Sequence, residues 1–489
     1  MIRKLYFLIL LFSIGVSCQQ KSESKDKPNV LFIAVDDLND WVGVMGGHPD
    51  TQTPNIDKLA GEGVLFTNAH CAAPLCGPSR ISLATGIHPT NSGYYMNSQG
   101  SFRNGLPDVV TLPQYFKENG YYVMGAGKLY PDSKNGFKKS FHEYKKVDTS
   151  AVFNINKYIY NNGPVGRFKN WVLDGGPLDI EDDQMVDGYN SKWAVDKLQN
   201  GNFDKPFFLA LGIFRPHIDW FAPRKYFDKF DPEKISLANV KENDLDDVPA
   251  YGKELALCTD DAATLKRDNQ ERKATAAYLA CVNFADAMIG RVLDALNTSK
   301  YADNTIVILW SDHGWHHGEK EHWRKFTLWQ KGTRVPFIVK VPQAVNNGTT
   351  SNEPVSLIDV YPTLLDLCGL PANETNDGKS IASLLTEKNA MIDKPVLVTY
   401  GKGNNSIKDK KYNYIQYHDG SEELYDRDKD PNEWTNLAQD PKYTDVIVRL
   451  KKHIPTKSAD YKTVSDRKIV PWHKTFSYIN GLDVEFMDW

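Results

Sequence analysis

The segment Val30-Leu31-Phe32-Ile33-Ala34-Val35, followed at once by Asp36-Asp37, is the clearest predicted β-strand of the chain. Residues 121–126, 207–214 and 305–310 form further apolar runs rich in β-branched and aromatic residues, and helical stretches separate these runs. Strands that alternate with helices are typical of an α/β fold. We therefore expect a large, mostly parallel sheet that is flanked by helices.

A polar cluster follows each of these strands at the point where the apolar run ends. Asp36-Asp37 follow the first strand, Gly127-Lys128 the second, Arg215-Pro216-His217 the third and Ser311-Asp312-His313-Gly314 the fourth. In open α/β sheets, ligands bind beyond the carboxyl ends of the strands. Four clusters at one edge of the sheet predict a functional site there, because scattered surface charges would not recur at the same position after each strand.

The stretch Cys76-Gly77-Pro78-Ser79-Arg80 continues to Thr85-Gly86 and has the form Cys-x-Pro-Ser-Arg-x-x-x-x-Thr-Gly. If this stretch has only a structural role, it is a buried cysteine beside the start of a helix, with Pro78 at the first helical position. It resembles the modification signature of the formylglycine-dependent (type I) sulfatases of the alkaline phosphatase superfamily. The resemblance implies that a formylglycine-generating or an anaerobic sulfatase-maturating enzyme oxidises Cys76 to an aldehyde, whose hydrate attacks a sulfate ester.

Other motifs extend this resemblance over residues 29–437, in the order that the family shows. The iduronate-2-sulfatase-like branch is nearest in its motifs. The family implies an alkaline-phosphatase-like catalytic domain and a smaller C-terminal α+β subdomain with an antiparallel sheet, which we place at residues 29–385 and 386–489. The motifs are Val35-Asp36-Asp37-Leu38, Thr53 to Ala60, Ser311 to Gly314, Trp323 to Lys325 and Glu423 to Glu433.

The acidic clusters predict a site for a hard cation. Asp36, Asp37 and Asp312 offer carboxylate oxygens, which suit Ca²⁺ or Mg²⁺, and His313 offers a less common ligand for either ion. An Asp-Asp pair after a strand is also consistent with a turn or a helix cap. Three carboxylates placed together without a cation would be costly, however. The resemblance implies Ca²⁺, with the modified Cys76 as a further ligand.

Four more residues receive roles from the motifs in which they lie. By resemblance, Arg80 orients the hydrated aldehyde, and Lys128 and Lys325 hold the sulfate oxygens. His217 is the best candidate for the acid that protonates the leaving oxygen. A packed or capping histidine is the alternative for His217, and solvated surface is the ordinary state of a single lysine.

One position departs from the family pattern. Family members carry a histidine two or three residues after the first lysine, whereas Lys128 is followed by Leu129-Tyr130-Pro131-Asp132. The base that acts on the hydrated aldehyde is therefore unassigned. His316, His317, His142 or solvent could take its place.

The N-terminus predicts export. Arg3-Lys4 precede an apolar run over residues 5–16 and Ser17, which is the pattern of a secretory signal over residues 1–17. Cys18 resembles the lipidated cysteine of a bacterial lipoprotein, although Gly15 departs from the usual pattern. Residues 18–28 would be a tether, the membrane would be contacted only through the lipid, and the protein would be periplasmic or on the outer membrane or cell surface. Without lipidation it would be secreted.

We therefore expect a sulfatase that acts on sulfated poly- or oligosaccharides, of the uronate-containing, algal (for example ulvan) or glycosaminoglycan type. Residues 97–103 and 215–224 are candidates for the sugar pocket. A phosphonate or phosphate monoester hydrolase and a non-catalytic glycan-binding lipoprotein are the alternatives. The net charge of -4 argues against a nucleic-acid partner. Pairing among Cys71, Cys258, Cys281 and Cys368 stays open.

Overall fold

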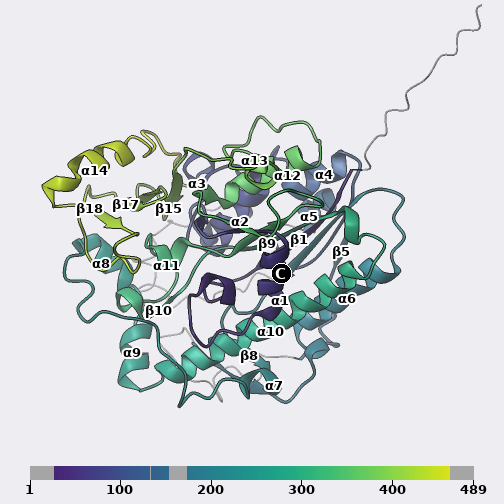
Figure 1. Cartoon of the computed structure of the whole chain (residues 1–489), viewed down its shortest axis with the longest axis horizontal. Coiled ribbons are helices and arrows are strands. Elements are labelled where there is room, and N and C mark those ends of the chain that lie inside the picture. The colour runs from purple at the N-terminus through teal and green to yellow at the C-terminus, as the bar shows by residue number, and fades with distance from the viewer. Residues whose placement is uncertain (1–26, 133, 154–172, 463–489) are drawn as a thin grey trace, which may run out of the picture.

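The predicted strand at residues 30–35 lies in the middle of an eight-stranded sheet (Figure 1). All adjacent strands in this sheet are parallel, except that the strand at residues 337–340 runs antiparallel to both of its neighbours. The mostly parallel α/β sheet is therefore confirmed. In spatial order the strands are β13 (Thr349–Ser351), β2 (Val64–Phe66), β12 (Phe337–Lys340), β9 (Thr305–Ser311), β1 (Asn29–Val35), β7 (Phe207–Ile213), β4 (Tyr122–Gly127) and β5 (Glu143–Lys145).

This computed structural model describes residues 27–132, 134–153 and 173–462. Cys18 and the expected signal segment lie outside these residues, so their assignment stays a prediction.

The register of the central strands aligns their carboxyl ends. Val35, the last residue of β1, pairs with Ser311 of β9 on one side and with Ile213 of β7 on the other. Gly127, the last residue of β4, pairs with Gly212 of β7. The four polar clusters that follow these strands therefore leave the sheet side by side at one edge.

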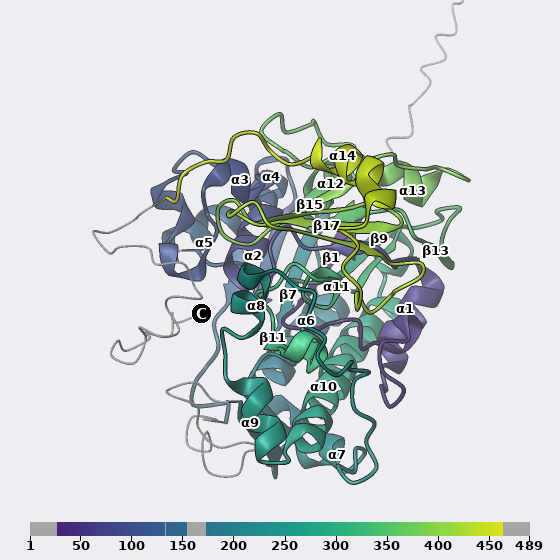
Figure 2. The same ribbon diagram turned by 90° about the vertical axis from the view of Figure 1, so that its left-hand side faces the viewer.

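Helices cover both faces of the sheet, which gives three layers (Figures 1 and 2). Phe32 and Ala34 of β1 point into a core that includes α2, α4 and α12, whereas Ile33 and Val35 point into a core with α1, α6 and α10. This alternation follows from the two-residue period of a strand. The helices are α1 (Pro54–Glu62), α2 (Cys76–Thr85), α3 (Pro89–Ser92), α4 (Leu112–Glu118), α5 (Lys134–Ser140), α6 (Val186–Asn200), α7 (Arg224–Phe227), α8 (Ala250–Ala256), α9 (Asp261–Arg267), α10 (Glu271–Asn297), α11 (Gln330–Thr333), α12 (Val360–Leu367), α13 (Ala382–Thr386) and α14 (Thr444–Lys451).

A separate four-stranded antiparallel sheet forms after residue 395 and packs against α14. Its strands, in order, are β15 (Val396–Thr399), β16 (Asn405–Lys408), β17 (Tyr412–Gln416) and β18 (Glu422–Asp426). The expected C-terminal antiparallel sheet is thus present. Short strand pairs complete the fold: β3 (Ala69–His70) with β14 (Val355–Ser356), β6 (Gly175–Leu178) with β8 (Trp220–Pro223), and β10 (His316–His317) with β11 (Trp323–Arg324).

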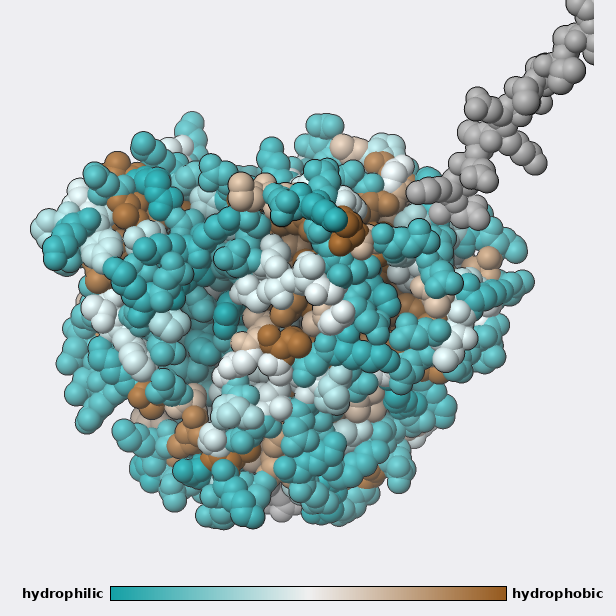
Figure 3. Space-filling model, in the orientation of Figure 1, coloured by the Kyte–Doolittle hydropathy of each residue, from teal (hydrophilic) through white to brown (hydrophobic). Residues whose placement is uncertain are grey.

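Among the described residues, α10 is the one helix whose length and apolar composition would suffice to cross a membrane, and 89% of its most apolar window is buried inside the fold. The surface in Figure 3 is mainly polar, with hydrophobic residues in small separate groups. The apolar character of α10 is thus accounted for by the core that it forms against the sheet.

The starts of α12, α2 and α1 differ in their local contacts. The Ser356 amide donates to Asp359 at 3.0 Å and caps the short 3-10 turn at residues 357–359, which leads directly into α12 at Val360. Pro78 is the third residue of α2, where its missing N–H is still one of those that lack a helical partner. Thr53 does not cap α1 with its side chain; its hydroxyl accepts the Gly43 amide instead.

Candidate active site

Asp36 and Asp37 leave the end of β1 with both side chains fully buried. Asp37 has a φ of 59°, a backbone region that residues other than glycine rarely adopt. Its amide donates to Asp312 Oδ1 at 3.1 Å, which joins the ends of β1 and β9. Backbone strain of this kind collects at functional sites.

Cys76 is the first residue of α2, a helix whose ten residues are all buried. The turn at its start is held by Asn97, whose Oδ1 accepts the Gly77 amide at 2.8 Å. A Cβ at Gly77 would lie 2.4 Å from that oxygen, so a larger residue there would require the Asn97 side chain to move. Asn97 was expected in the sugar pocket, and here it fixes the turn that presents Cys76.

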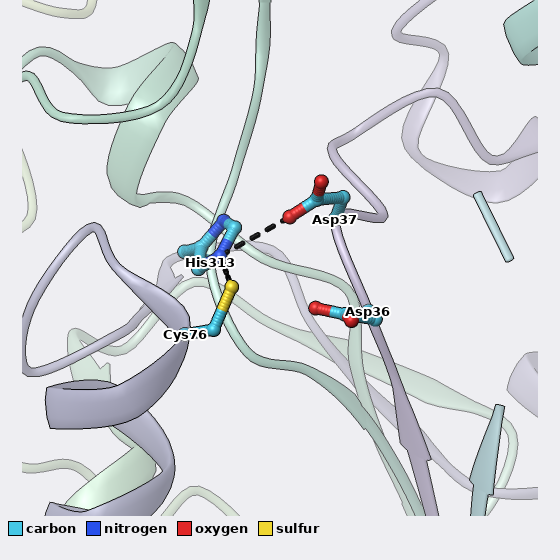
Figure 4. A group of neighbouring side chains, drawn as sticks. All are labelled: Asp36, Asp37, Cys76 and His313. Carbon is cyan, nitrogen blue, oxygen red and sulfur yellow. Dashed lines mark hydrogen bonds and ion pairs between the residues drawn. The ribbon is translucent and has the colours of Figure 1, made fainter. Parts of the chain in front are cut away.

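Four of the predicted residues form one compact group, shown in Figure 4. The possible ligand atoms of Asp36, Asp37, Cys76 and His313 all lie within 4.8 Å of one another. His313 Nε2 is 3.2 Å from both Cys76 Sγ and Asp37 Oδ1. His313 Nδ1 donates to the Gly314 carbonyl at 3.0 Å, so Nε2 presents a lone pair to the group.

Three cations surround these groups, each facing a carboxylate. Lys325 Nζ lies 2.6 Å from Asp37 Oδ1 and 3.1 Å from Cys76 Sγ. Lys128 contacts Asp36, and Arg80 donates through Nε to Asp312 Oδ2 at 2.8 Å. Three carboxylates thus face three cations, and the described side chains balance in charge.

Arg80 also fixes the backbone next to Lys128. Its Nη1 donates to the carbonyls of Lys128 and Leu129 at 2.7 and 2.9 Å. The close approach of β4 and β7 depends on Gly212, because a Cβ there would lie 2.2 Å from the Lys128 carbonyl oxygen. The position of Lys128 is therefore set by backbone contacts.

His217 lies at the rim, in the turn after β7. Its side chain is 21% exposed and its Nε2 is 3.9 Å from Asp37 Oδ2. Its Nδ1 donates to the Ile218 carbonyl at 2.5 Å. The remaining nitrogen, Nε2, faces the buried group.

The two neighbouring aspartates have opposite pKa shifts. Burial raises the pKa of Asp37, although Lys325 opposes this. Burial also acts to raise the pKa of Asp36, but Lys128 and the other cations hold it well below its usual value. Burial raises the pKa of Cys76 despite Lys325 and lowers the pKa of His217 well below its usual value. The unmodified thiol is therefore protonated at neutral pH.

All of the predicted catalytic and metal-binding residues meet at this edge. Asp312 stands slightly apart from the compact group, because its oxygens accept from the Asp37 amide and from Arg80. The structure places the candidate substitute bases elsewhere: His142 Nδ1 accepts the Val123 amide at the start of β4, His316 contacts Thr327, and His317 stacks on Trp41. The base therefore stays unassigned.

One contributor to the site was missed by the sequence analysis. His322 lies between two carbonyl oxygens: its Nε2 is 2.5 Å from that of Lys325 and its Nδ1 is 2.6 Å from that of Ala256. Arg324 and Phe326, on either side of Lys325, have φ of 111° and 82°. The only signal was the position of His322 within the motif around Lys325.

The remaining cysteines are free. Cys71, Cys281 and Cys368 are buried and Cys258 is partly buried, each as a free thiol in the described part of the chain. Their pairing, which the sequence left open, is thus not seen here.

The model of the family described as "Sulfatase" matches residues 28–370, and the model "N-sulphoglucosamine sulphohydrolase, C-terminal" matches residues 318–460. A sulfatase of Formosa agariphila is 38% identical over 97% of each chain. Iduronate 2-sulfatase of Homo sapiens is 31% identical over 72% of this chain and 70% of that protein. An ulvan-active sulfatase of Formosa agariphila is 27% identical over 93% and 86%.

Solved structures share the fold. A phosphonate monoester hydrolase of Silicibacter pomeroyi superposes with a TM-score of 0.72, at 21% identity over 87% of this chain and 94% of that one. BT4656, solved with its substrate D-glucosamine-2-N,6-O-disulfate, gives a TM-score of 0.70 at 20% identity over 87% and 96%. The family models and the relatives agree with the predicted enzyme class. The chain belongs to the sulfatase family of the alkaline phosphatase superfamily and is a sulfuric ester hydrolase.

Proposed function

We propose that this sulfatase hydrolyses sulfate esters of sulfated poly- or oligosaccharides, with a formylglycine derived from Cys76 as nucleophile and a divalent cation beside it. The observation that carries the proposal is the position of Cys76 Sγ, 3.2 Å from His313 Nε2 and 3.1 Å from Lys325 Nζ. A buried thiol with a raised pKa is a poor nucleophile. Oxidation by a maturation enzyme would give the position an oxygen nucleophile, the hydrated aldehyde.

The donor set fits a cation. Asp37 Oδ2 is buried without a hydrogen-bond partner among the described residues, and Asp37 Oδ1 faces the lone pair of His313 Nε2 at 3.2 Å. Lys325 already pairs with Asp37 Oδ1, so the unpartnered Oδ2 is the oxygen that a bound cation would satisfy. Asp36, Asp37, Asp312, His313 and the modified Cys76 would hold the ion. Carboxylate oxygens favour Ca²⁺, with Mg²⁺ as the alternative, and the ion would draw charge from the sulfate oxygens.

Charge balance gives a second reason for the cation. The carboxylates of Asp36, Asp37 and Asp312 are matched by three side-chain cations, so the site without an ion has no positive surplus for an anion. A divalent ion supplies that surplus. Lys128 and Lys325 are then available to bind sulfate oxygens, because both amino groups lie beside the nucleophile position.

Two further side chains act on the reacting groups. Arg80, held between Asp312 and the carbonyls after β4, orients the nucleophile. The imidazolium form of His217, with its second proton on Nε2, would protonate the leaving sugar oxygen, and an anionic sulfate ester beside the ring would favour that form. A sugar alkoxide leaves poorly, so this proton decides the rate for a carbohydrate ester.

The substrate class rests on the relatives. One is described as an ulvan-active sulfatase, another as iduronate 2-sulfatase, and the C-terminal model bears the name of a sulfoglucosamine hydrolase. All of these names refer to sulfated sugars. They support a sulfated glycan, of the uronate-containing, algal or glycosaminoglycan type, for this chain.

Mass spectrometry of the peptide that contains Cys76, combined with sulfate release from a panel of defined sulfated oligosaccharides, tests the proposal. We expect an aldehyde in place of the thiol, release of sulfate from at least one sugar, and loss of activity in EDTA that Ca²⁺ restores. An active preparation that still carries the thiol at residue 76, or that is indifferent to chelation, would refute it.

A phosphonate or phosphate monoester hydrolase is the second candidate, because the phosphonate monoester hydrolase of Silicibacter pomeroyi shares the fold. Phosphoryl and sulfuryl esters both need a cation and an oxygen nucleophile. Turnover of 4-nitrophenyl sulfate, 4-nitrophenyl phosphate and a phenylphosphonate monoester separates the candidates. A higher kcat/KM for either phosphorus ester would favour the second.

We also propose that the protein is exported and anchored through lipid on Cys18. The basic and apolar segment over residues 3–16 supports export. Cys18→Ala should move the protein from the membrane fraction to the soluble fraction of cells that process lipoproteins. A parent protein that is already in the soluble fraction would instead indicate a plain cleaved signal.

A further inference from the structure

His217 lies between β7 and β8, in a segment at residues 214–221 that includes the first two residues of β8 and is here called the turn. Inside the turn, the His217 amide donates to the Phe214 carbonyl at 3.0 Å, and Trp220 Nε1 donates to the Pro216 carbonyl at 2.8 Å. These bonds shape the turn, but they do not attach it to the sheet. The position of the imidazole therefore depends on what holds the start of the turn.

Asp187 holds the start of the turn. It is the second residue of α6, its side chain is buried, and its two oxygens accept consecutive amides: Phe214 N–H at 2.7 Å and Arg215 N–H at 2.9 Å. These are the first two amides after β7 ends. Both oxygens are used on the turn, so the carboxylate aligns the chain as it leaves the sheet.

Arg215 transmits this alignment to the histidine. Its guanidinium is buried, Nη1 donates to the His217 carbonyl at 3.1 Å and Nε donates to the Phe221 carbonyl at 2.8 Å. One side chain thus ties the middle of the turn to its end. Because the amide of Arg215 is itself bound by Asp187, the carboxylate, the guanidinium and the His217 backbone form one chain of contacts.

The imidazole is placed by the same backbone. His217 Nδ1 donates to the Ile218 carbonyl at 2.5 Å, which leaves Nε2 3.9 Å from Asp37 Oδ2. Proton transfer to a leaving oxygen needs heavy atoms within hydrogen-bond distance, and a displacement of 1 Å can cost about 100-fold in rate. A change in the turn therefore reaches the reaction through Nε2.

We propose that Asp187, acting through Arg215, is a positioning residue for His217 and so sets how well the enzyme expels a poor leaving group. The inference rests on the proposed role of His217 as the acid for the leaving oxygen. A carboxylate that merely stabilised the fold would lower activity on all substrates alike. A positioning residue instead changes the dependence of the rate on the leaving group.

Asp286 offers a matched control. Like Asp187 it is a buried helix carboxylate that accepts two consecutive amides, Asn55 N–H at 3.1 Å and Ile56 N–H at 2.8 Å. These amides open α1, so the bonds lie away from the turn at residues 214–221. Asp286→Asn and Asp187→Asn make the same chemical change, in which an amide NH₂ replaces one accepting oxygen.

The test is the ratio of kcat/KM for 4-nitrophenyl sulfate to that for phenyl sulfate, measured with the mature calcium-loaded enzyme. Nitrophenolate leaves without help, whereas phenolate benefits from an acid. We expect His217→Ala to raise the ratio by roughly 100-fold, Asp187→Asn by about tenfold, and Asp286→Asn not at all. Arg215→Gln, which removes both guanidinium bonds to the turn, should act like Asp187→Asn and replaces it if that variant fails to fold.

The outcomes separate the two proposals. A raised ratio in His217→Ala with an unchanged ratio in Asp187→Asn or Arg215→Gln overturns the positioning role and leaves the proposed function intact. An unchanged ratio in His217→Ala removes the proposed role of His217 itself. If aryl sulfates turn over too slowly, the ¹³C-histidine spectrum decides: the His217 ring resonance should move in Asp187→Asn and not in Asp286→Asn, and an unmoved resonance overturns the inference.

Discussion

The active site and a second group of buried polar and charged residues, here called the C-terminal network (Lys408, Asn413, Glu423 and Glu433), differ in how their polar atoms are partnered. In the network Trp329 donates to Glu423 at 2.8 Å, the Gln330 amide donates to Glu433 at 2.7 Å, and Lys408 donates to the Leu328 carbonyl at 2.9 Å. Every polar side-chain atom of its four members has a partner, in contrast to Asp37 Oδ2 in the site.

The difference separates structural charge from functional charge. A buried charge that is fully hydrogen-bonded needs no further ligand, and here it joins the loop after Lys325 to the antiparallel sheet. The site combines a carboxylate oxygen without a partner, Asp37 Oδ2, with the crowding of Asp36, Asp37, Cys76 and His313, whose possible ligand atoms lie within 4.8 Å of one another. Those costs are offset when a ligand binds.

Cys76→Ala should separate the two regions most strongly. We expect sulfate release to fall by at least about 1,000-fold, because the nucleophile is gone, while the free energy of unfolding changes by about 1 kcal/mol or less. Ion chromatography of released sulfate and urea unfolding measure the two effects. Cys71→Ala, a buried thiol in the same segment, is the control and should stay active. Activity above a tenth of the parent in Cys76→Ala would contradict the proposal.

Asp37→Asn should abolish the response to calcium. A ligand that binds only the folded protein stabilises it by about 2.7 kcal/mol at 100 times its Kd, and most of that gain should vanish without this carboxylate. Thermal unfolding in EDTA and in excess CaCl₂ measures the difference. Asp40→Asn is the matched control, since Asp40 is buried and paired with Lys331 and Arg334. Equal calcium responses in both variants would refute the cation site.

Glu423→Gln should lower stability and leave activity nearly unchanged, which is the opposite of the effect expected for a mutation in the active site. Three donors, from Trp329, Tyr417 and Tyr425, point at this carboxylate, and an amide cannot accept all of them. We expect a loss of about 2–3 kcal/mol in unfolding free energy, with kcat/KM of the folded enzyme within about threefold of the parent. Glu422→Gln, the partly exposed neighbour, should cost less than about 1 kcal/mol. A large loss of activity without a loss of stability would show that the C-terminal network takes part in catalysis, which would contradict its structural role.

Lys408 should give the smallest effect, a pH dependence of stability. Burial lowers the pKa of Lys408 to about 7, although Glu433 opposes this, whereas the unfolded chain titrates near 10.5. Between these values the unfolded state binds more protons, so stability rises with pH. We expect a gain of roughly 2 kcal/mol from pH 7 to 9 in urea unfolding, which Lys408→Met removes. Identical slopes in parent and variant would show that Lys408 stays charged.

The carboxyl-edge site could be predicted because its residues follow strands directly. Asp36, Lys128, His217 and Asp312 each stand within a few residues of an apolar run, and parallel strands bring their ends to one edge. The family motifs added Cys76 and Lys325, which no strand end marks. Helix boundaries were less predictable, since Pro78, expected at the first helical position, is the third residue of α2.

The order of residues along the chain was thus enough to predict the α/β class, the chemical groups at the site and the edge of the sheet where they meet. This is because the periods of strands and helices are properties of neighbouring residues. The sequence alone did not predict which oxygen pairs with which cation. Asp312 is engaged by Arg80, Asp187 supports the turn of His217, and His317 stacks on Trp41. Such contacts join residues far apart in the chain, and they depend on sheet register and on close packing, which no spacing in the sequence encodes.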